Sequence, residues 1–372
     1  QKTALKTKVK RMLIAGGLTA LIAVPLLLGN AGMRKVDAAQ GDVKINSTNF
    51  PDEEFRKYIS KNIDRNKDGV LSKAEIKKVT EIKLEHYDEA GNEYVYNDLT
   101  GIGVFTELKR LECESQKSLS KLDLHKNTKL EFVKCGHNGI KELNVSKLTK
   151  LKELRCYYNK LTKLDVSKNV KLELLACDSN NLTGLDLRKN TKLVVLGCSS
   201  NKLTKLDLKK NTKLNILWCS SNKLTKLDVT KNLDLVDLYC HTNKLTKLNV
   251  DKNEKLVCLV CSDNKLTQLR LTNNKQLVKL ECAKNQLTQL DTSQNNALVW
   301  VDCADNKLTK LDFSASPLCD RIDCSSNKLT EVIIAEGVKK TSVYYDQEID
   351  RLIDLLVTSL SVETVVTHSN FV

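Results

Sequence analysis

Residues 64–75 carry oxygen-bearing side chains at the intervals that a calcium ion requires. In the EF-hand loop, side chains at the first, third and fifth positions, a carbonyl at the seventh and a glutamate at the twelfth hold the ion. Gly69 stands at the sharp turn, and Ser72 at the often water-mediated ninth position. The predicted ligands are Asp64, Asn66, Asp68, Val70 through its carbonyl, and Glu75. One loop alone indicates a structural calcium site, and the alternative is a metal-free polar turn.

The thirteen cysteines are a second group of residues that could carry chemistry, as disulfides or as reactive thiols. Ten of them recur every 21 residues, and an eleventh precedes them: Cys113, Cys135, Cys156, Cys177, Cys198, Cys219, Cys240, Cys261, Cys282, Cys303 and Cys324. Stacked thiols whose Cβ vectors run parallel do not suit disulfide geometry, so we expect reduced, buried thiols that act as small apolar side chains. Cys319 is expected inside as well. Cys258 stands at an outward position and is either a reactive thiol or an inert one.

The other polar residues form no catalytic set. The five histidines are scattered, Asp and Ser recur with the repeat, and no nucleophile with its base and no phosphate-binding loop is present. We therefore expect a binding protein and not an enzyme.

The elements that position these residues follow from the repeat. Segments such as Leu214–Asn222 fit L-x-x-L-x-C-x-x-N, and the second half of each repeat is close to K-L-T-K-L-D-L-x-K-N. This pattern predicts a leucine-rich-repeat solenoid of about eleven coils with a parallel β-sheet, shaped as a horseshoe or rod, with little helix in the repeats. The second half is expected to form an extended segment on the opposite wall. A ladder of buried asparagines should close the turns: Asn159, Asn180, Asn201, Asn222, Asn243, Asn264, Asn285, Asn306 and Asn327.

Four regions are expected along the chain. Residues 1–38 have a basic start, an apolar run and a small-residue site ending at Ala38, which is typical of a cleaved secretory signal peptide. An uncleaved membrane anchor is the alternative. Residues 39–98 are expected to form a helical cap, with helices over 53–63 (capped by Asp52) and 72–82. The array spans 99–334, and 335–372 form a C-terminal cap or a tail.

The distribution of charge and the predicted secretion of the chain argue against nucleic acid as a partner. The net charge is +14, but residues 1–38 hold seven Lys and Arg against one Asp, so much of the basic excess belongs to the predicted signal peptide. A secreted or bacterial cell-surface chain does not meet nucleic acid in its usual setting. No stable transmembrane segment is expected after signal cleavage.

The 21-residue repeat with its cysteine ladder resembles the internalin J type of bacterial surface leucine-rich-repeat proteins. The resemblance covers about residues 99–334 and extends to Asn49-Phe50-Pro51-Asp52, which is similar to the entry of the cap that opens internalins. It implies an adhesin-like, protein-binding role on a bacterial surface. The complete calcium loop and the absence of a visible wall-sorting motif depart from that pattern.

Variation among the coils indicates where a partner binds. The second half changes little, whereas the outward positions beside each ladder cysteine run from basic through aromatic and apolar to acidic. Exposed aromatics rimmed by charge are typical of protein interfaces, and scattered neutral aromatics are the alternative. The predicted partner-binding residues are Phe132, Arg155, Tyr157, Tyr158, Ile216, Trp218, Tyr239, His241, Val260 and Trp300.

The expected partner is an extracellular protein or glycoprotein. A polysaccharide could instead stack on the same aromatics. The recurring lysines of the second half could attract an anionic polymer, although a solvated face balanced by Asp207 and its equivalents explains them too. These lysines include Lys202, Lys205, Lys209, Lys210 and Lys213.

Overall fold

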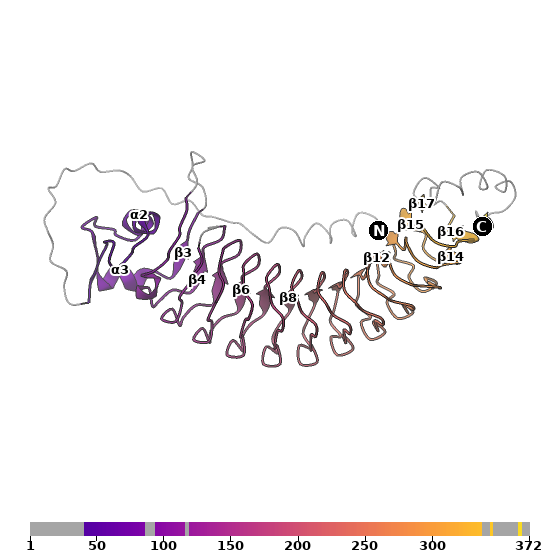
Figure 1. Cartoon of the computed structure of the whole chain (residues 1–372), viewed down its shortest axis with the longest axis horizontal. Helices are drawn as coiled ribbons and strands as arrows, with labels where there is room; N and C mark the ends of the chain where they lie inside the picture. Colours follow the sequence, from indigo (N-terminus) through magenta and orange to yellow (C-terminus); the bar gives the residue numbers. More distant parts are fainter. Residues whose placement is uncertain (1–40, 86–93, 116–118, 337–342, 345–363, 367–372) are drawn as a thin grey trace. The chain divides into compact units, whose positions relative to one another are not determined.

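The computed structural model describes residues 41–85, 94–115, 119–336, 343–344 and 364–366. These residues belong to one of the two units of the chain, residues 37–372, and the predicted signal peptide lies outside them. Thirteen short strands, each parallel to its neighbours, form the main sheet (Figure 1). In spatial order they are β3 Glu81–Lys83, β4 Arg110–Glu112, β5 Phe132–Lys134, β6 Glu153–Arg155, β7 Leu174–Ala176, β8 Val195–Gly197, β9 Ile216–Trp218, β10 Asp237–Tyr239, β11 Cys258–Val260, β12 Lys279–Glu281, β13 Trp300–Asp302, β15 Arg321–Asp323 and β17 Val343–Tyr344. The predicted leucine-rich-repeat solenoid is confirmed.

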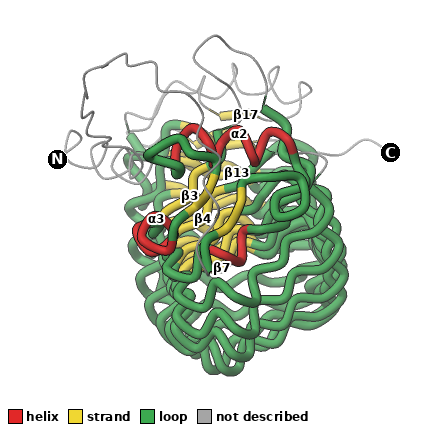
Figure 2. Tube along the Cα trace, turned by 90° about the vertical axis from the view of Figure 1, so that its left-hand side faces the viewer, coloured by secondary structure: helices red, strands yellow, loops and turns green. Residues whose placement is uncertain are grey.

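The strands arise from alternation of apolar and variable residues. In β9 the central Leu217 is 1% exposed, whereas Trp218 beside it is 41% exposed. Leu217 pairs with Leu238 of β10, one repeat later, so each buried position stacks on its equivalent in the next coil. Figure 2, which looks along the array, shows these strands stacked on one side of the coils. One side of each strand therefore belongs to the core, and the other faces outward.

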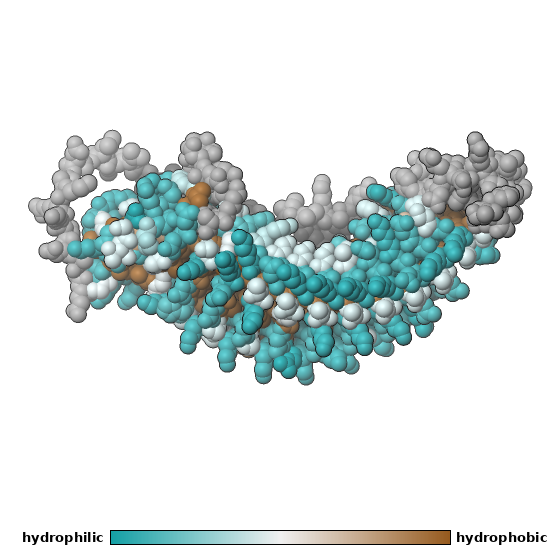
Figure 3. Space-filling model, in the orientation of Figure 1, coloured by the Kyte–Doolittle hydropathy of each residue, from teal (hydrophilic) through white to brown (hydrophobic). Residues whose placement is uncertain are grey.

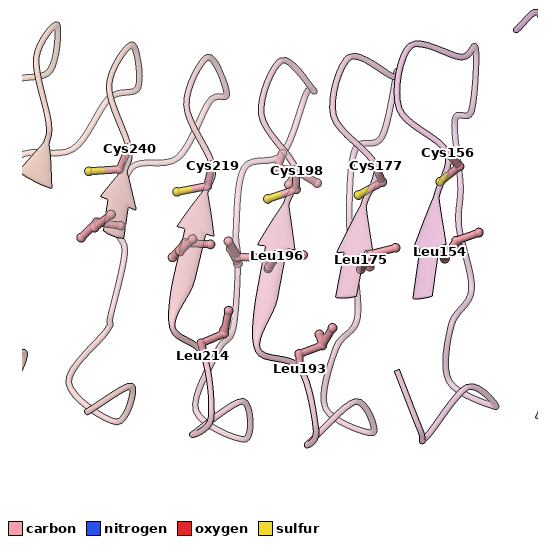
Figure 4. Close-up of a cluster of buried hydrophobic side chains, with 14 of the residues drawn as sticks. Leu154, Cys156, Leu175, Cys177, Leu193, Leu196, Cys198, Leu214, Cys219 and Cys240 are labelled. Carbon is pink, nitrogen blue, oxygen red and sulfur yellow. The ribbon is translucent and has the colours of Figure 1, made fainter. Parts of the chain in front are cut away.

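The ladder cysteines continue this buried row. All thirteen cysteines are free and buried. Figure 4 shows the sulfur atoms of Cys156, Cys177, Cys198, Cys219 and Cys240 pointing in the same direction. Burial raises the pKa of the Cys135 thiol to about 12, which keeps it protonated and unreactive at neutral pH. The expected buried ladder is confirmed, and Cys319 is fully buried as expected.

The predicted asparagine ladder is also present. The Asn222 amide nitrogen donates to the carbonyls of Cys198 (3.0 Å) and Cys219 (3.2 Å), and its oxygen accepts from the amide of Leu203 (3.0 Å). The same pattern recurs along the array. The residue directly before each of these asparagines is left-handed, with φ between 50° and 53° from His137 to Ser326, and this conformation turns the chain out of the strand.

A second asparagine ladder, which the sequence analysis missed, closes the other turn. Its members are buried and donate to two carbonyls of the preceding coil: Asn127, Asn169, Asn190, Asn211, Asn232, Asn253, Asn274 and Asn295. The Asn211 amide, for example, lies 3.1 Å from the Leu187 oxygen and 2.9 Å from the Asn190 oxygen. These bonds satisfy carbonyls that the turn would otherwise leave buried without a donor.

The second half of each coil lies on the wall opposite the main sheet, as expected, but it pairs as a strand in few places. Among the described residues it pairs as strands only in the last coils, where β14 Lys310–Phe313 pairs with β16 Glu331–Ile334, plus one isolated bridge between Asp228 and Asn249. Elsewhere a single backbone bond per coil joins neighbours, such as Lys202 to Leu182 at 2.8 Å. The second halves lie on the outer side of the curved array in Figure 1, where neighbouring coils diverge.

Two helices precede the array. Helix α2 Glu53–Asn62 begins at the predicted cap, where an Asp52 oxygen accepts from the Phe55 amide at 2.8 Å. Helix α3 Lys73–Lys78 ends well before the predicted Ile82, because Ile82 enters β3 and pairs with Leu111 of the first coil. The prediction for the end of that helix was therefore wrong. Phe55 and Ile59 of α2 share one hydrophobic core with the leucines of the array, which supports the proposal that residues 39–98 cover the first coil.

Strands also follow the last coil. β17 extends the main sheet beyond β15, and β18 Thr364–Val366 pairs antiparallel with β16. Most of residues 335–372 lie outside the described residues, so cap or tail stays an open prediction. None of the described helices has both the length and the apolar character that crossing a bilayer takes.

Thiol counting will test the cysteine ladder. We expect the native protein to react slowly or not at all with a thiol reagent, because every cysteine is buried. After denaturation without reductant, all thirteen thiols should react. A denatured count well below thirteen that rises on reduction would show disulfides and contradict the ladder.

Candidate binding surface

The outward residues of the main sheet form the candidate surface. We call it the variable face and define it as the first and third residues of β4 to β13 and β15, together with the two residues after each ladder cysteine. Its composition changes from coil to coil, whereas the buried positions repeat. In Figure 3, hydrophilic side chains form rows running from coil to coil along the array. The varying outward positions are therefore the ones that could distinguish one protein partner from another.

The middle of the variable face is apolar and aromatic. Trp218 pairs in register with Tyr239, and Ile216 stands two residues before Trp218 on β9. Leu174 and Val195 occupy the position of Ile216 in the two preceding coils. Trp218 is 41% exposed, so its ring offers a large accessible area at the centre of the sheet. His241 follows Cys240, partly buried beside Thr242.

Two residues of the middle are less accessible than the sequence suggested. Val260 is only 4% exposed and Cys258 only 7% exposed. The Cys258 sulfur lies 3.3 Å from the Tyr239 hydroxyl, so the larger neighbouring side chain covers it. Burial raises the pKa of this thiol, which favours the inert alternative over the reactive one. Val260 was predicted to contact a partner, but in this conformation it presents almost no area to one.

The basic beginning of the face is electrically neutralised. Arg110 pairs with Glu112 (2.6 Å) and lies over the Phe132 ring at 3.5 Å. Lys134 pairs with Glu114 at 2.5 Å, and Arg155 pairs with Glu153. The sequence predicted a basic beginning because the residues directly before the ladder cysteines, Lys134 and Arg155, are cations. The carboxylates on neighbouring positions cancel most of that charge.

An aromatic cluster lies beside this neutral region. Tyr158 stacks on His137 with ring centres 4.4 Å apart, and Tyr157 meets His137 edge-on at 5.3 Å. Tyr158 is 55% exposed. Gly136 leaves the space for Tyr157, since a Cβ there would approach the ring to 2.8 Å. The sequence analysis missed His137, although it stands one repeat before Tyr158 and could have been found in that column.

Trp300 is flanked by cations at the far end of the face. The Lys279 ammonium lies 4.3 Å and the Arg321 guanidinium 4.4 Å from its ring centre. Such contacts hold the ring in place and reduce the area that a partner could reach. In the third strand position, Glu281, Asp302 and Asp323 follow one another on β12, β13 and β15. The third strand position is therefore acidic at this end, beside the cations Lys279 and Arg321 in the first position.

The structure thus divides the ten predicted contacts into three places. Ile216, Trp218, Tyr239, His241 and the buried Val260 lie together on β9 to β11 and directly after β10. Phe132, Arg155, Tyr157 and Tyr158 lie on or after β5 and β6, and Trp300 lies on β13. In the central group Trp218 is exposed, whereas Ile216, Tyr239 and His241 are partly buried.

The recurring aspartates on the lysine side of the array also hold its turns. The Asp207 carboxylate accepts from the backbone amide of Lys209 at 3.2 Å, and Asp228 accepts from that of Thr230 at 3.1 Å. These aspartates close turns and form no ion pairs with the recurring lysines among the described residues. One repeat before Asp207, however, Asp186 pairs with Arg188 at 2.7 Å. Balance of the lysines by Asp207 and its equivalents therefore stays a prediction, and an anionic polymer stays an alternative ligand.

The predicted calcium loop is closed by its own carboxylates. Asp64 accepts from the amides of Lys67 (2.8 Å) and Gly69 (3.0 Å), and Glu75 accepts from Arg65 (2.9 Å). β2 Val70–Leu71 pairs antiparallel with β1 Val43–Lys44, so an adjacent strand supports the loop. Hydrogen bonds from backbone amides inside the loop therefore fix the carboxylates of Asp64, at the first position, and Glu75, at the twelfth.

No three His, Cys, Asp or Glu side chains in the described part of the chain gather as a group that could hold a metal ion. The predicted set depends on a mixture of ligands, with the Asn66 amide and the Val70 carbonyl beside the three carboxylates. Each carboxylate oxygen that accepts one hydrogen bond keeps a second lone pair. The loop chemistry fits a hard cation, and calcium binding stays a prediction.

Comparison with known proteins places the chain among solved leucine-rich-repeat structures. No protein-family model and no curated protein matches it. It is similar to the functional domain of InlJ from Listeria monocytogenes, which includes a cysteine ladder, at 33% identity and a TM-score of 0.71 over 80% of this chain and 69% of that chain. The internalin inlF from the same organism is 18% identical with a TM-score of 0.62, over 77% of this chain and 93% of that one. YopM, a leucine-rich effector protein from Yersinia pestis, is 21% identical with a TM-score of 0.53, over 78% of this chain and 87% of that one. The last two show the fold alone.

Cys258 offers a direct test of how the centre of the face is packed. We expect Tyr239→Ala to uncover this thiol, so that the native variant reacts at one site, whereas the wild type does not. Mass spectrometry after brief alkylation identifies the labelled cysteine. Tyr158→Ala is the matched control, because it removes an exposed tyrosine elsewhere on the face. Equal labelling of Cys258 in all three proteins would show that Tyr239 does not shield it.

Proposed function

This chain belongs to the internalin J family of bacterial leucine-rich-repeat proteins with a cysteine ladder, and from that premise we propose that it binds an extracellular protein on its variable face. We place it in the secreted or cell-surface class, where it would act as an adhesin without catalysing a reaction. The observation that carries the proposal is the exposed apolar centre around Trp218 and Tyr239.

Energetic reasoning favours this centre over the rest of the array. Large aromatics at the middle of an interface commonly cost about 2 kcal/mol or more when truncated, whereas charges at the rim cost much less. A rigid sheet also presents these side chains without a large ordering cost on binding. The second-half lysines stand on long flexible side chains in water, where each ion pair contributes little.

The aromatic cluster supports a second candidate function. Stacked Tyr158 and His137 present exposed ring faces beside Glu114 and Tyr157, a combination that suits a sugar ring. A glycoprotein or polysaccharide could therefore bind at β5 and β6, outside the central group. The two candidates differ in which aromatic residue is essential.

The loop at residues 64–75 supports a separate proposal for calcium. Position by position, its residues supply the ligand types of an EF-hand, and the extracellular concentration of calcium suits a single structural site. The ion would hold the helices α2 and α3 together beside the first coil.

Substitution at Trp218 tests the binding proposal. We expect Trp218→Ala to weaken capture of a partner from host or bacterial extracts at least about tenfold, equivalent to about 1.4 kcal/mol. Lys205→Ala on the lysine side should change it little. Equal losses at both positions would indicate an anionic polymer. Loss at Tyr158→Ala with competition by free oligosaccharide would favour the carbohydrate alternative.

Calorimetry tests the calcium proposal. Calcium should give a one-site isotherm with the wild type and raise its unfolding temperature, because a ligand that binds only the folded state stabilises it. Glu75→Ala should lose both effects, and Glu142→Gln, an exposed glutamate in the array, should keep them. A wild type that neither binds calcium nor gains thermal stability would identify the loop as a metal-free turn.

A further inference from the structure

Ion pairs are distributed unevenly over the variable face. At its beginning, the cations Arg110, Lys134 and Arg155 each pair with a glutamate of the same region. At its end, Glu281 pairs with Lys279 at 2.7 Å. None of the described ion pairs involves Asp302 or Asp323. The Asp302 carboxylate accepts a hydrogen bond from the Ala304 amide, and the Asp323 carboxylate accepts from the amide and hydroxyl of Ser325. At this end of the face two carboxylates, those of Asp302 and Asp323, therefore form no ion pair among the described residues, while the Arg321 guanidinium of the same face lies 4.4 Å from the Trp300 ring centre.

The acidic residues stand in register. Glu281 pairs with Asp302, and Asp302 pairs with Asp323, each on a neighbouring parallel strand. Like charges on directly adjacent strands repel one another and weaken a sheet. A core-building role does not explain them, because they point outward from the buried centres of their strands. A cationic group bound between them would remove the repulsion.

The acidic residues also continue the apolar column. Trp218, Tyr239 and Val260 occupy the same strand position on β9, β10 and β11 that the acidic residues occupy on β12, β13 and β15. Neighbouring strands lie about 4.8 Å apart, and one turn of an α-helix rises about 5.4 Å. A helix lying along the array would thus present roughly one side chain to each coil, first to the aromatic half and then to the acidic half.

We propose that the occupant of the variable face is an amphipathic helix of a protein partner, whose apolar residues contact Trp218 and Tyr239 and whose lysine or arginine residues bind Asp302 and Asp323. This inference rests on the proposed function and specifies the partner class for the same surface. Helices that lay an apolar face into a groove are a common mode of recognition, and the charges fix the direction in which the helix lies.

Three synthetic helical peptides provide the probe. They share an apolar first half and carry three lysines, three glutamines or three glutamates in the second half. The readout is tryptophan fluorescence in a Trp300→Phe background, where Trp218 is the remaining tryptophan of the two in the chain. We expect the lysine peptide to bind at least about tenfold more tightly than the glutamine peptide and the glutamate peptide to bind most weakly. Higher salt should reduce the difference, because the contacts are exposed.

Charge removal on the protein completes the test. Asp302→Asn with Asp323→Asn should abolish the preference for the lysine peptide and leave the protein folded, as circular dichroism would show. Glu142→Gln with Glu254→Gln removes the same charge from exposed positions off the variable face and should preserve the preference.

The outcomes separate this inference from the proposed function. Equal binding of all three peptides, or a lysine preference that survives the double asparagine substitution, would overturn the basic helix. So would the absence of binding by any peptide. The proposed function would still be decided by whether Trp218→Ala weakens capture of a protein partner, because that experiment does not depend on the charge or conformation of the occupant.

Discussion

The fold depends on one constraint: a coil of 21 residues cannot bury its leucines by itself. Each coil must stack on the next in the same register, and stacking places the backbone carbonyls of every turn inside the protein. Buried carbonyls need donors, and two asparagine ladders supply them, one after the strand and one in the opposite turn. The small thiols of the cysteine ladder fit the space between these turns because they add bulk without demanding strong hydrogen bonds.

Both ends of such a stack would leave unpaired strand edges and open core. At the beginning, β3 joins the sheet and the apolar side of α2 joins the core. At the other end, β17 continues the main sheet, and β18 pairs antiparallel with β16. An antiparallel strand breaks the parallel pattern on which a further copy of the array could stack, and in this way it blunts the edge.

The features of the fold that could be predicted from the sequence are those that occupy the same position in every repeat. The period placed the buried leucines, the cysteines and the first asparagine ladder, because each of these occupies a fixed slot in every coil. Properties that arise between coils were less accessible. Tyr239 covers Cys258 from the neighbouring strand, and Glu114 neutralises Lys134 from the coil before. The second asparagine ladder was visible in the repeat, but its role follows only from the buried carbonyls of a turn whose path the sequence does not specify. The end of α3 was mistaken because Ile82 belongs to the sheet, a tertiary effect that overrides local helical spacing.

The separation of repeating and varying positions also explains how this architecture can carry a specific function. Substitution in a buried slot disturbs the stacking of two neighbours, whereas substitution at an outward strand position changes the surface and its side-chain contacts without opening the core. Binding specificity can therefore change coil by coil at little cost to the fold. The present face uses this freedom unevenly: its cations are paired internally at one end, Trp218 is exposed in the middle, and Asp302 and Asp323 form no ion pair among the described residues at the other end. Asp302 and Asp323 each accept a hydrogen bond from the backbone of the turn that follows, so they contribute to the fold locally, but that role would not require them to stand on adjacent strands where like charges repel.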